Sequence, residues 1–142
     1  MSEKIGNIIP PPLRFEMGAK DDAADQAVKA FLLVTVDHEF QPRVAVLAPT
    51  EVKAMDERCV RFRVHVQSTT QKNLRRTLSA MLWCVLDGAA YSLRGGAQPV
   101  HEEGDFVEFE MSVAEVLRDF YPDSPMVSGP TFRRMKSEPS AN

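Results

Sequence analysis

Residues 59–73 read Cys-Val-Arg-Phe-Arg-Val-His-Val-Gln-Ser-Thr-Thr-Gln-Lys-Asn, and they indicate a strand that leads directly into a helix. Apolar residues at the even positions alternate with Arg61, Arg63 and His65 at the odd positions. A β-strand keeps this period of two, whereas a helix repeats every 3.6 residues. The sequence therefore predicts a strand over 59–66 with one apolar and one charged face.

The polar run that follows predicts the start of a helix. Hydroxyl and amide side chains fill positions 67–70, and such side chains favour helix caps. We expect Thr69 or Thr70 to cap a helix over 71–77. Leu74 and Leu78 are four residues apart, which would place both on its buried face.

Upstream of this junction, two apolar runs predict an antiparallel hairpin. The runs cover residues 31–37 and 43–48, and a polar, turn-like patch at 38–42 separates them. After a break at Pro49 and Thr50, residues 51–55 continue the strand and residues 56–58 turn it.

Downstream, the Asp87-Gly88 pair between apolar runs indicates a second hairpin, with strands over 80–86 and 89–94. Gly95-Gly96 then favours a β-bulge or a tight bend over a phosphate-binding loop. A last alternating strand covers 105–111. We expect Ser112 to cap a helix over 113–120.

The two ends of the chain differ in character from the middle. Three consecutive prolines at 10–12 hold the chain extended, so residues 1–20 are expected to form an arm outside the core. The charge order in 21–30 predicts a short helix. Residues 21–122 would form the domain and residues 123–142 a tail, with its last seven residues disordered.

This pattern of hairpins with few helices predicts a mainly β member of the α+β class, in which five or six antiparallel strands form a closed or partly closed barrel. One domain is expected for 142 residues.

The 17 basic and 20 acidic side chains give a net charge of −3, which argues against a nucleic-acid-coating surface. With neither a signal-peptide pattern nor a membrane-length apolar run, a cytoplasmic protein is expected.

Cysteine and histidine spacing gives no metal motif. Cys59 and Cys84 lie among apolar residues, which favours buried thiols over a disulfide. The histidines at 38, 65 and 101 lack HxxxH or HExxH spacing, so no zinc site is expected.

The junction at 65–73 is the segment best suited to bind an anion. A helix start offers unpaired N–H groups and the positive end of the helix dipole. Lys72 in the first turn opposes that dipole by ~0.3–1 kcal/mol, and a bound phosphate would remove this conflict. Arg43, Arg61 and Arg63 either extend this basic site or lie on an ordinary solvated face.

The order of these segments resembles that of the FMN-binding split-barrel proteins related to pyridoxamine 5'-phosphate oxidase. The resemblance rests on the hairpin from Phe31 to Val44, the junction from Val64 to Leu74, and the segment Leu93-Arg94-Gly95-Gly96-Ala97. It implies a six-stranded antiparallel split β-barrel with short peripheral helices. It also implies a homodimer with the FMN groove at its interface.

Carried onto this chain, the resemblance assigns FMN contacts to residues of the first hairpin and of the junction. The expected cofactor-binding residues are Arg43, Val44, His65, Val66, Gln67, Thr70, Gln71, Lys72 and Asn73. The phosphate would bind at Thr70, Gln71 and Lys72, with the flavin ring along 43–46 and 65–67.

A flavin-dependent oxidoreductase acting on a small molecule is therefore expected, with no nucleic-acid or membrane partner. No dedicated acid, base or nucleophile is evident, which fits chemistry done by a cofactor. It fits equally a barrel that binds flavin or haem without turnover, or a deazaflavin-dependent reductase.

His65 could serve as a haem ligand. Trp83 belongs to the core or the dimer interface, or stacks on the flavin ring. Pyridoxamine phosphate oxidases carry further basic residues near the C-terminus, for which Arg133-Arg134 is the nearest match, so the substrate is not assigned.

Overall fold

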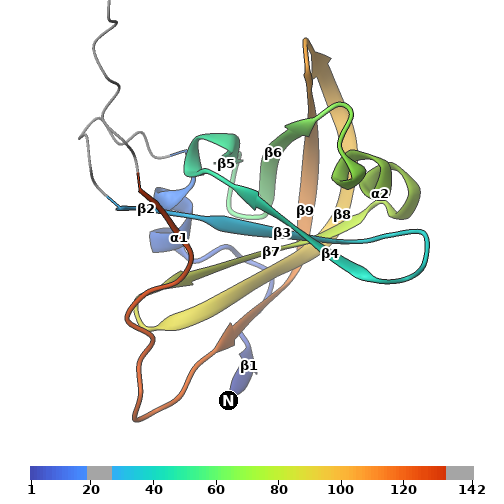
Figure 1. Ribbon diagram of the computed structural model, residues 1–142. Coiled ribbons are helices and arrows are strands. Elements are labelled where there is room, and N and C mark those ends of the chain that lie inside the picture. Colours follow the sequence, from blue (N-terminus) through green and yellow to red (C-terminus); the bar gives the residue numbers. More distant parts are fainter. Residues whose placement is uncertain (19–26, 134–142) are drawn as a thin grey trace, which may run out of the picture.

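The computed structural model describes residues 1–18 and 27–133 of the chain (Figure 1). Its elements are β1 (Ser2–Lys4), α1 (Pro11–Glu16), β2 (Ala27–Lys29), β3 (Phe31–Val36), β4 (Pro42–Leu47), the 3-10 turn η1 (Pro49–Glu51), β5 (Val52–Ala54), β6 (Cys59–His65), α2 (Thr69–Thr77), β7 (Ser79–Leu86), β8 (Ala89–Glu103), β9 (Phe106–Asp119) and β10 (Thr131–Arg133). No helix in these two ranges is long and apolar enough to cross a membrane.

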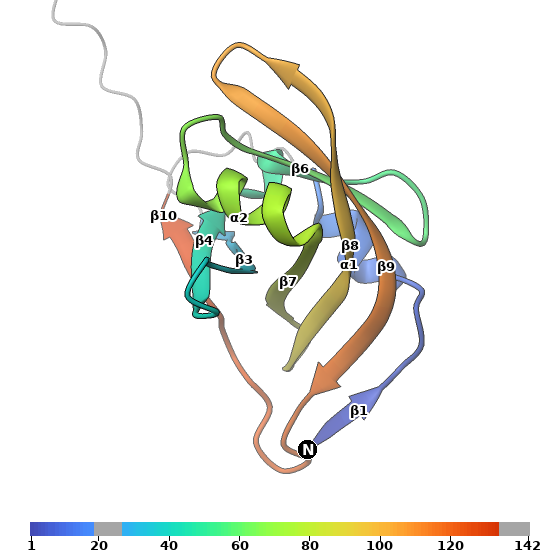
Figure 2. The same ribbon diagram turned by 90° about the vertical axis from the view of Figure 1, so that its right-hand side faces the viewer.

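One curled antiparallel sheet forms most of the molecule (Figure 2). Its strands follow the order β4-β3-β7-β8-β9-β6-β5, and β1 pairs with β9. Within the described residues no pairing joins β4 to β5, so the barrel is split between them. The mainly β fold class is confirmed. The described sheet has eight strands where six were expected, because β1 joins it and β5 stands as a separate short strand.

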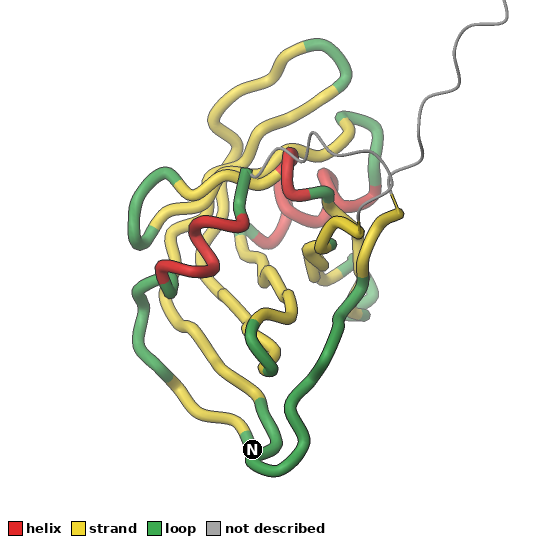
Figure 3. Tube along the Cα trace, turned by 90° about the vertical axis from the view of Figure 1, so that its left-hand side faces the viewer, coloured by secondary structure: helices red, strands yellow, loops and turns green. Residues whose placement is uncertain are grey.

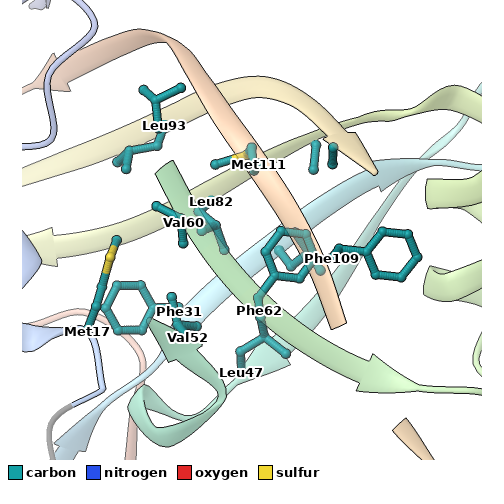
Figure 4. Close-up of a cluster of buried hydrophobic side chains, with 14 of the residues drawn as sticks. Met17, Phe31, Leu47, Val52, Val60, Phe62, Leu82, Leu93, Phe109 and Met111 are labelled. Atoms are coloured by element: carbon teal, nitrogen blue, oxygen red, sulfur yellow. The ribbon is translucent and has the colours of Figure 1, made fainter. Parts of the chain in front are cut away.

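The core forms where the inward faces of the strands meet (Figure 4). Phe62 of β6 and Phe109 of β9 stack at its centre, with ring centroids 6.0 Å apart and planes 13° from parallel. Both rings are 1% exposed or less, and burying such a side chain contributes about 1.5–3 kcal/mol. The period of two predicted for 59–66 is confirmed, since Val60, Phe62 and Val64 are buried.

The N-terminal segment is part of this core, which corrects the expectation of an arm outside it. Ile9 and Leu13 are 0% and 1% exposed, and the backbone N–H of Ile9 donates to the carbonyl of Glu57 over 2.8 Å. Pro11 and Pro12 begin α1 (red in Figure 3). At the start of a helix the missing proline N–H costs nothing, because that group has no intrahelical acceptor there.

The long hairpin of β8 and β9 replaces the helix expected over 113–120. In the β8–β9 register, Gly95 pairs with Val113 and Arg94 with Glu115, so Ala114 is an extra residue. This β-bulge confirms the interpretation of Gly95-Gly96, although β8 continues through it to Glu103. It also explains the error, because the bulge puts Val113 and Val116, three residues apart, on the same buried face.

Part of the helix expected over 21–30 is also wrong. Residues 27–29 form β2, which pairs with β10, and the N–H of Ala30 donates to the carbonyl of Pro130 over 2.9 Å. Backbone partners from the C-terminal segment thus override the local helix preference. Residues 21–26 lie outside the described residues, as do the last seven residues, 136–142, for which disorder was expected.

Candidate functional site

The start of α2 is built by the turn that connects it to β6. Ser68 caps the helix: its Oγ accepts from the backbone N–H of Gln71 over 3.1 Å and donates to the carbonyl of His65 over 2.7 Å. The expected cap at Thr69 or Thr70 is therefore wrong by one or two residues, because Ser68 is the residue with extended backbone before the helix. The helix consequently begins at Thr69.

The first turn of α2 presents hydrogen-bond donors and one cation. The N–H groups of Thr69 and Thr70 have no acceptor among the described residues, as expected at a helix start. Lys72 is exposed and has no carboxylate within 4 Å in the described part of the chain. The turn holds no acidic residue, although acids are the side chains that a helix start favours.

Two of the expected cofactor-binding residues are engaged inside the protein. The amide of Gln71 donates from Nε2 to the carbonyl of Val66 over 2.7 Å, and its Oε1 accepts from Arg75. Asn73 is 2% exposed and donates from Nδ2 to Thr35 Oγ1 over 3.2 Å. Asn73 therefore fixes α2 to β3, and Gln71 fixes its first turn to the preceding loop. Thr70 and Lys72 are the expected phosphate residues that stay open to a ligand.

The C-terminal end of α2 differs from the expectation for its buried face. Leu74 is fully buried, but Leu78 is 52% exposed. Leu78 ends the helix at φ 53°, in the left-handed region, and its N–H donates to the carbonyl of Leu74 over 2.8 Å. This conformation turns the side chain out as the chain enters β7, so the helical spacing from Leu74 no longer applies.

Arg43 and Val44 point to opposite sides of β4. Arg43 pairs in register with Thr35, which also contacts Asn73, so Arg43 lies on the face of the sheet that carries α2. Val44 pairs with Val34 on the outer face, where its side chain is 60% exposed. The structure therefore brings Arg43 and α2 to one side and leaves only the backbone of Val44 available to the same ligand.

Asp37, which the sequence interpretation did not select, anchors Arg43. It is 3% exposed, and its Oδ2 accepts from Arg43 Nε over 2.8 Å. Its Oδ1 accepts from the backbone N–H groups of Glu39 and Gln41, each over 2.9 Å. The hydrogen bond from Gln41, then that from Arg43, lower the pKa of Asp37 to about 2, so its carboxylate is charged at neutral pH. The signal available in the sequence was an Asp directly after an apolar strand and before a turn.

His65 ends β6, and Val66 and Gln67 begin the turn that leads to α2. The backbone N–H of Gln67 donates to His65 Nδ1 over 3.2 Å, and the His65 ring lies edge-on to Phe106 at 6.0 Å. The side chains of His65 and Gln67 are exposed, and that of Val66 is half-buried. The backbone N–H of Val66 donates to the carbonyl of Asp105 over 2.7 Å.

Two further arginines considered for the basic site are engaged on the outer face of β6. Arg61 binds Glu110 over 2.9 Å and Glu108 over 3.3 Å. The guanidinium of Arg63 lies 4.7 Å above the ring of Phe106. Arg61 is thus neutralised, which favours the solvated-face alternative for this residue.

The outer face of β4, β3 and β7 is apolar. Val44, Val34 and Met81 form one row across the three strands, and Val46, Leu32 and Trp83 form a second row. Val44 and Val46 are 60% and 52% exposed, and the other four side chains are half-buried. We call these six residues the outer apolar face.

Neither cysteine has the character of a reactive thiol. Both are free, Cys84 is buried as expected, and Cys59 is half-buried. Burial raises the pKa of Cys84 to about 12 and that of Cys59 to about 11, so both remain protonated at neutral pH.

The comparisons with known proteins identify the fold. No family model matches the chain, and no curated protein matches it. Solved structures do match. A proposed pyridoxamine 5'-phosphate oxidase from Lactobacillus delbrueckii superposes with a TM-score of 0.63 at 12% identity, covering 80% of this chain and 98% of the other.

Two further structures show the range of proteins that share this architecture. PhzG from Burkholderia lata 383, solved with tetrahydrophenazine-1-carboxylic acid, has a TM-score of 0.57 at 14% identity, covering 76% of this chain and 82% of its own. HutZ, the haem storage protein from Vibrio cholerae, has a TM-score of 0.51 at 13% identity, covering 63% and 84%. The chain has the split-barrel fold of the pyridoxamine 5'-phosphate oxidase-like proteins, as its sequence predicted.

Proposed function

We propose that this protein binds FMN at the start of α2 and is a flavin-dependent oxidoreductase acting on a small molecule. The observation that carries the proposal is the first turn of α2, which offers threonine hydroxyls, two backbone N–H groups and the cation of Lys72, none of these N–H groups or the cation having a partner among residues 1–18 and 27–133. A phosphate dianion satisfies all of these groups at once. The split-barrel fold and its flavin-related neighbours support the same reading.

The residues present fit the phosphate end of FMN. Lys72 and the Thr70 hydroxyl would hold the phosphate together with the helix N–H groups, and Arg43 would reach the cofactor from β4. His65 and Gln67 would line the flavin ring, with a backbone contact from Val44. The N–H and carbonyl of Val66, which was also expected to contact the cofactor, already bind Asp105 and Gln71. When bound, FMN supplies hydride or electron transfer, and the protein supplies binding and orientation.

A homodimer is part of this proposal. Arg43, His65 and Lys72 are all exposed in a single chain, whereas cofactor sites usually bury most of their ligand. A second copy seated on the outer apolar face would cover apolar surface and bury more of the cofactor. Arg43 and Val44 lie on opposite faces of β4, and β4 is the edge strand of the described sheet, so the site and the outer apolar face meet along this edge.

Charge reversal at Lys72 tests the phosphate site. Lys72→Glu should weaken FMN binding by about 100-fold, since a charge-assisted hydrogen bond becomes a repulsion. Flavin fluorescence quenching measures the affinity, and circular dichroism checks the fold. Lys53→Glu, the same charge change at an exposed position on β5, is the control and should bind like the wild type. Equal affinity of Lys72→Glu and wild type would refute the phosphate site.

Charge placed on the outer apolar face tests the dimer. The wild type should have a mass of about 32 kDa in solution, twice the 15.9 kDa of one chain. Val46→Glu should give a monomer, because a buried carboxylate without a partner opposes association, and should lose FMN as well. Val127→Glu, at a residue that is 97% exposed, should remain dimeric. A monomeric wild type that binds FMN would exclude the dimer.

Haem is the second candidate ligand. The side chain of His65 is exposed, and one structural neighbour is a haem storage protein. Haem ligation through Nε2 would need the tautomer that is protonated at Nδ1, so the hydrogen bond from the Gln67 N–H to Nδ1 would be lost on binding. A Soret band in the purified protein that is lost in His65→Ala would support haem. A yellow protein with flavin absorbance supports FMN, and uptake of a deazaflavin in preference to FMN would support the reductase alternative. An activity assay on the purified protein with its cofactor bound would distinguish an oxidoreductase from a barrel that binds without turnover. Cell fractionation would test the expected cytoplasmic location.

A further inference from the structure

The tip of the β3–β4 hairpin is organised by one buried carboxylate. Asp37 accepts three hydrogen bonds, two from the backbone N–H groups of Glu39 and Gln41 and one from Arg43 Nε. The N–H of Asp37 also donates to the carbonyl of Gln41 over 2.9 Å, which closes the turn. A single side chain therefore sets both the shape of the turn and the position of the arginine that follows it.

Arg43 is fixed at one end and open at the other. Its Nε is bound to Asp37, but its side chain is 62% exposed, whereas that of Asp37 is 4% exposed. The described residues offer no partner to its two terminal nitrogens. The guanidinium is planar, so fixing Nε also fixes the plane in which the remaining N–H groups point.

The free edge of Arg43 lies on the side of the sheet that carries α2. Thr35 pairs with Arg43 in the β3–β4 register and accepts the hydrogen bond from Asn73 of α2. Arg76 of α2 binds the carbonyl of Val36, immediately before Asp37. The hairpin tip is therefore joined to the middle and the last turn of α2, the helix whose first turn holds the proposed phosphate site.

We propose that Asp37 is a positioning residue of the cofactor site, which holds Arg43 so that its free N–H groups are directed at the bound FMN. This inference rests on the proposed function. The Asp37–Arg43 pair is neutral overall, so Arg43 contributes directed donors while Lys72 contributes the net positive charge. Without Asp37, the long side chain of Arg43 would be ordered only when FMN binds. The conformational entropy lost in that step would weaken the affinity for FMN by about tenfold.

A double-mutant cycle separates positioning of Arg43 from a general effect on the turn. The variants are Asp37→Asn, Arg43→Gln and the double variant, with FMN affinity measured by fluorescence quenching. Asparagine keeps an Oδ1 acceptor for the two backbone N–H groups but removes the anion that holds Arg43. The titrations are run in about 0.5 M NaCl, where the Debye length of roughly 4 Å suppresses the effect of the unpaired charge.

We expect Asp37→Asn to weaken FMN about tenfold in the wild-type background and to have no effect in the Arg43→Gln background. Equal weakening in both backgrounds, or none in either, would overturn the positioning role. Glu39→Gln, at the exposed tip of the same turn, is the control and should bind like the wild type. If the wild type binds no FMN, the proposed function fails and this role fails with it.

Arg43→Lys provides a test that leaves the turn intact, in case Asp37→Asn fails to fold. Lysine keeps the charge but lacks the planar fork, so FMN should again bind about tenfold more weakly. In the wild type without cofactor, ¹⁵N relaxation should show an ordered Arg43 Nε, and in Asp37→Asn a mobile one. Wild-type affinity in Arg43→Lys, or a mobile Nε in the wild type, would contradict the proposal.

Discussion

Asn73 of α2 donates from Nδ2 to the hydroxyl of Thr35 of β3 over 3.2 Å, and both side chains are at least 97% buried. This contact joins the helix that starts the candidate site to the strand that leads to Asp37 and Arg43. A buried polar pair of this kind is costly to break, because the remaining partner is left without a hydrogen bond.

We therefore expect Asn73→Ala to lower the free energy of unfolding by about 1–3 kcal/mol. It should also weaken FMN binding, because α2 loses its polar contact with the sheet. Urea denaturation measures the first effect. Lys72→Ala, at an exposed position one residue earlier, should change stability by less than about 0.5 kcal/mol. A fully stable Asn73→Ala would show that the contact does not anchor the helix.

The regular strands and the β6–α2 junction could be predicted because their information is local. The alternation in 59–66 and the caps at 67–70 are short-range patterns, and the structure confirms a strand and a helix there. The position of Asp37 beside Arg43 was less accessible. A turn with a buried carboxylate has no distinctive spacing, and its partners are visible only once the hairpin register is known.

Long-range pairing explains the elements that were missed. Residues 113–119 continue β9 because β8 and β1 supply backbone partners, and the extra Ala114 disguises the strand as a helix pattern. Residues 27–29 follow β10 for the same reason. The sequence analysis misses α1 because three consecutive prolines favour an extended chain, whereas Pro11 and Pro12 occupy the start of the helix.

Gly95 should be among the least replaceable residues of the sheet. A Cβ at this position would lie 1.8 Å from the carbonyl oxygen of Ser112, so the two backbones at the bulge would have to separate. We expect Gly95→Ala to cost about 3 kcal/mol or more. Gly96→Ala is the matched control, since its Cβ would lie 3.8 Å from the nearest atom, the Leu78 carbonyl oxygen. Thermal denaturation of the two variants would contradict this account if they were equally stable.

Phe40 adopts a left-handed backbone conformation at the hairpin tip, with φ 61°, while its ring is 87% exposed. An L-residue pays about 1–2 kcal/mol for this conformation and glycine does not, so Phe40→Gly should be more stable than Phe40→Ala by about 1 kcal/mol. The exposed ring contributes little packing to offset the strain. Chemical denaturation of the two variants checks the order, and a more stable alanine variant would show that the tip relaxes.

Asp37 should make the stability of the protein depend on pH in the acid range. Its folded pKa of about 2 lies below the ordinary value of 3.8, because backbone N–H groups and Arg43 favour the charged form. The unfolded chain therefore takes up the proton first as the pH falls, and the stabilisation, complete above about pH 5, is lost progressively as the pH falls toward 2. The stability difference between wild type and Asp37→Asn should be constant from pH 7 to 5 and shrink toward pH 2.5.

Urea denaturation across this range measures that difference, in which the titration of all other carboxyl groups cancels. A difference that stays the same at pH 2.5 would mean that the Asp37 carboxylate is not held in its charged form by the fold.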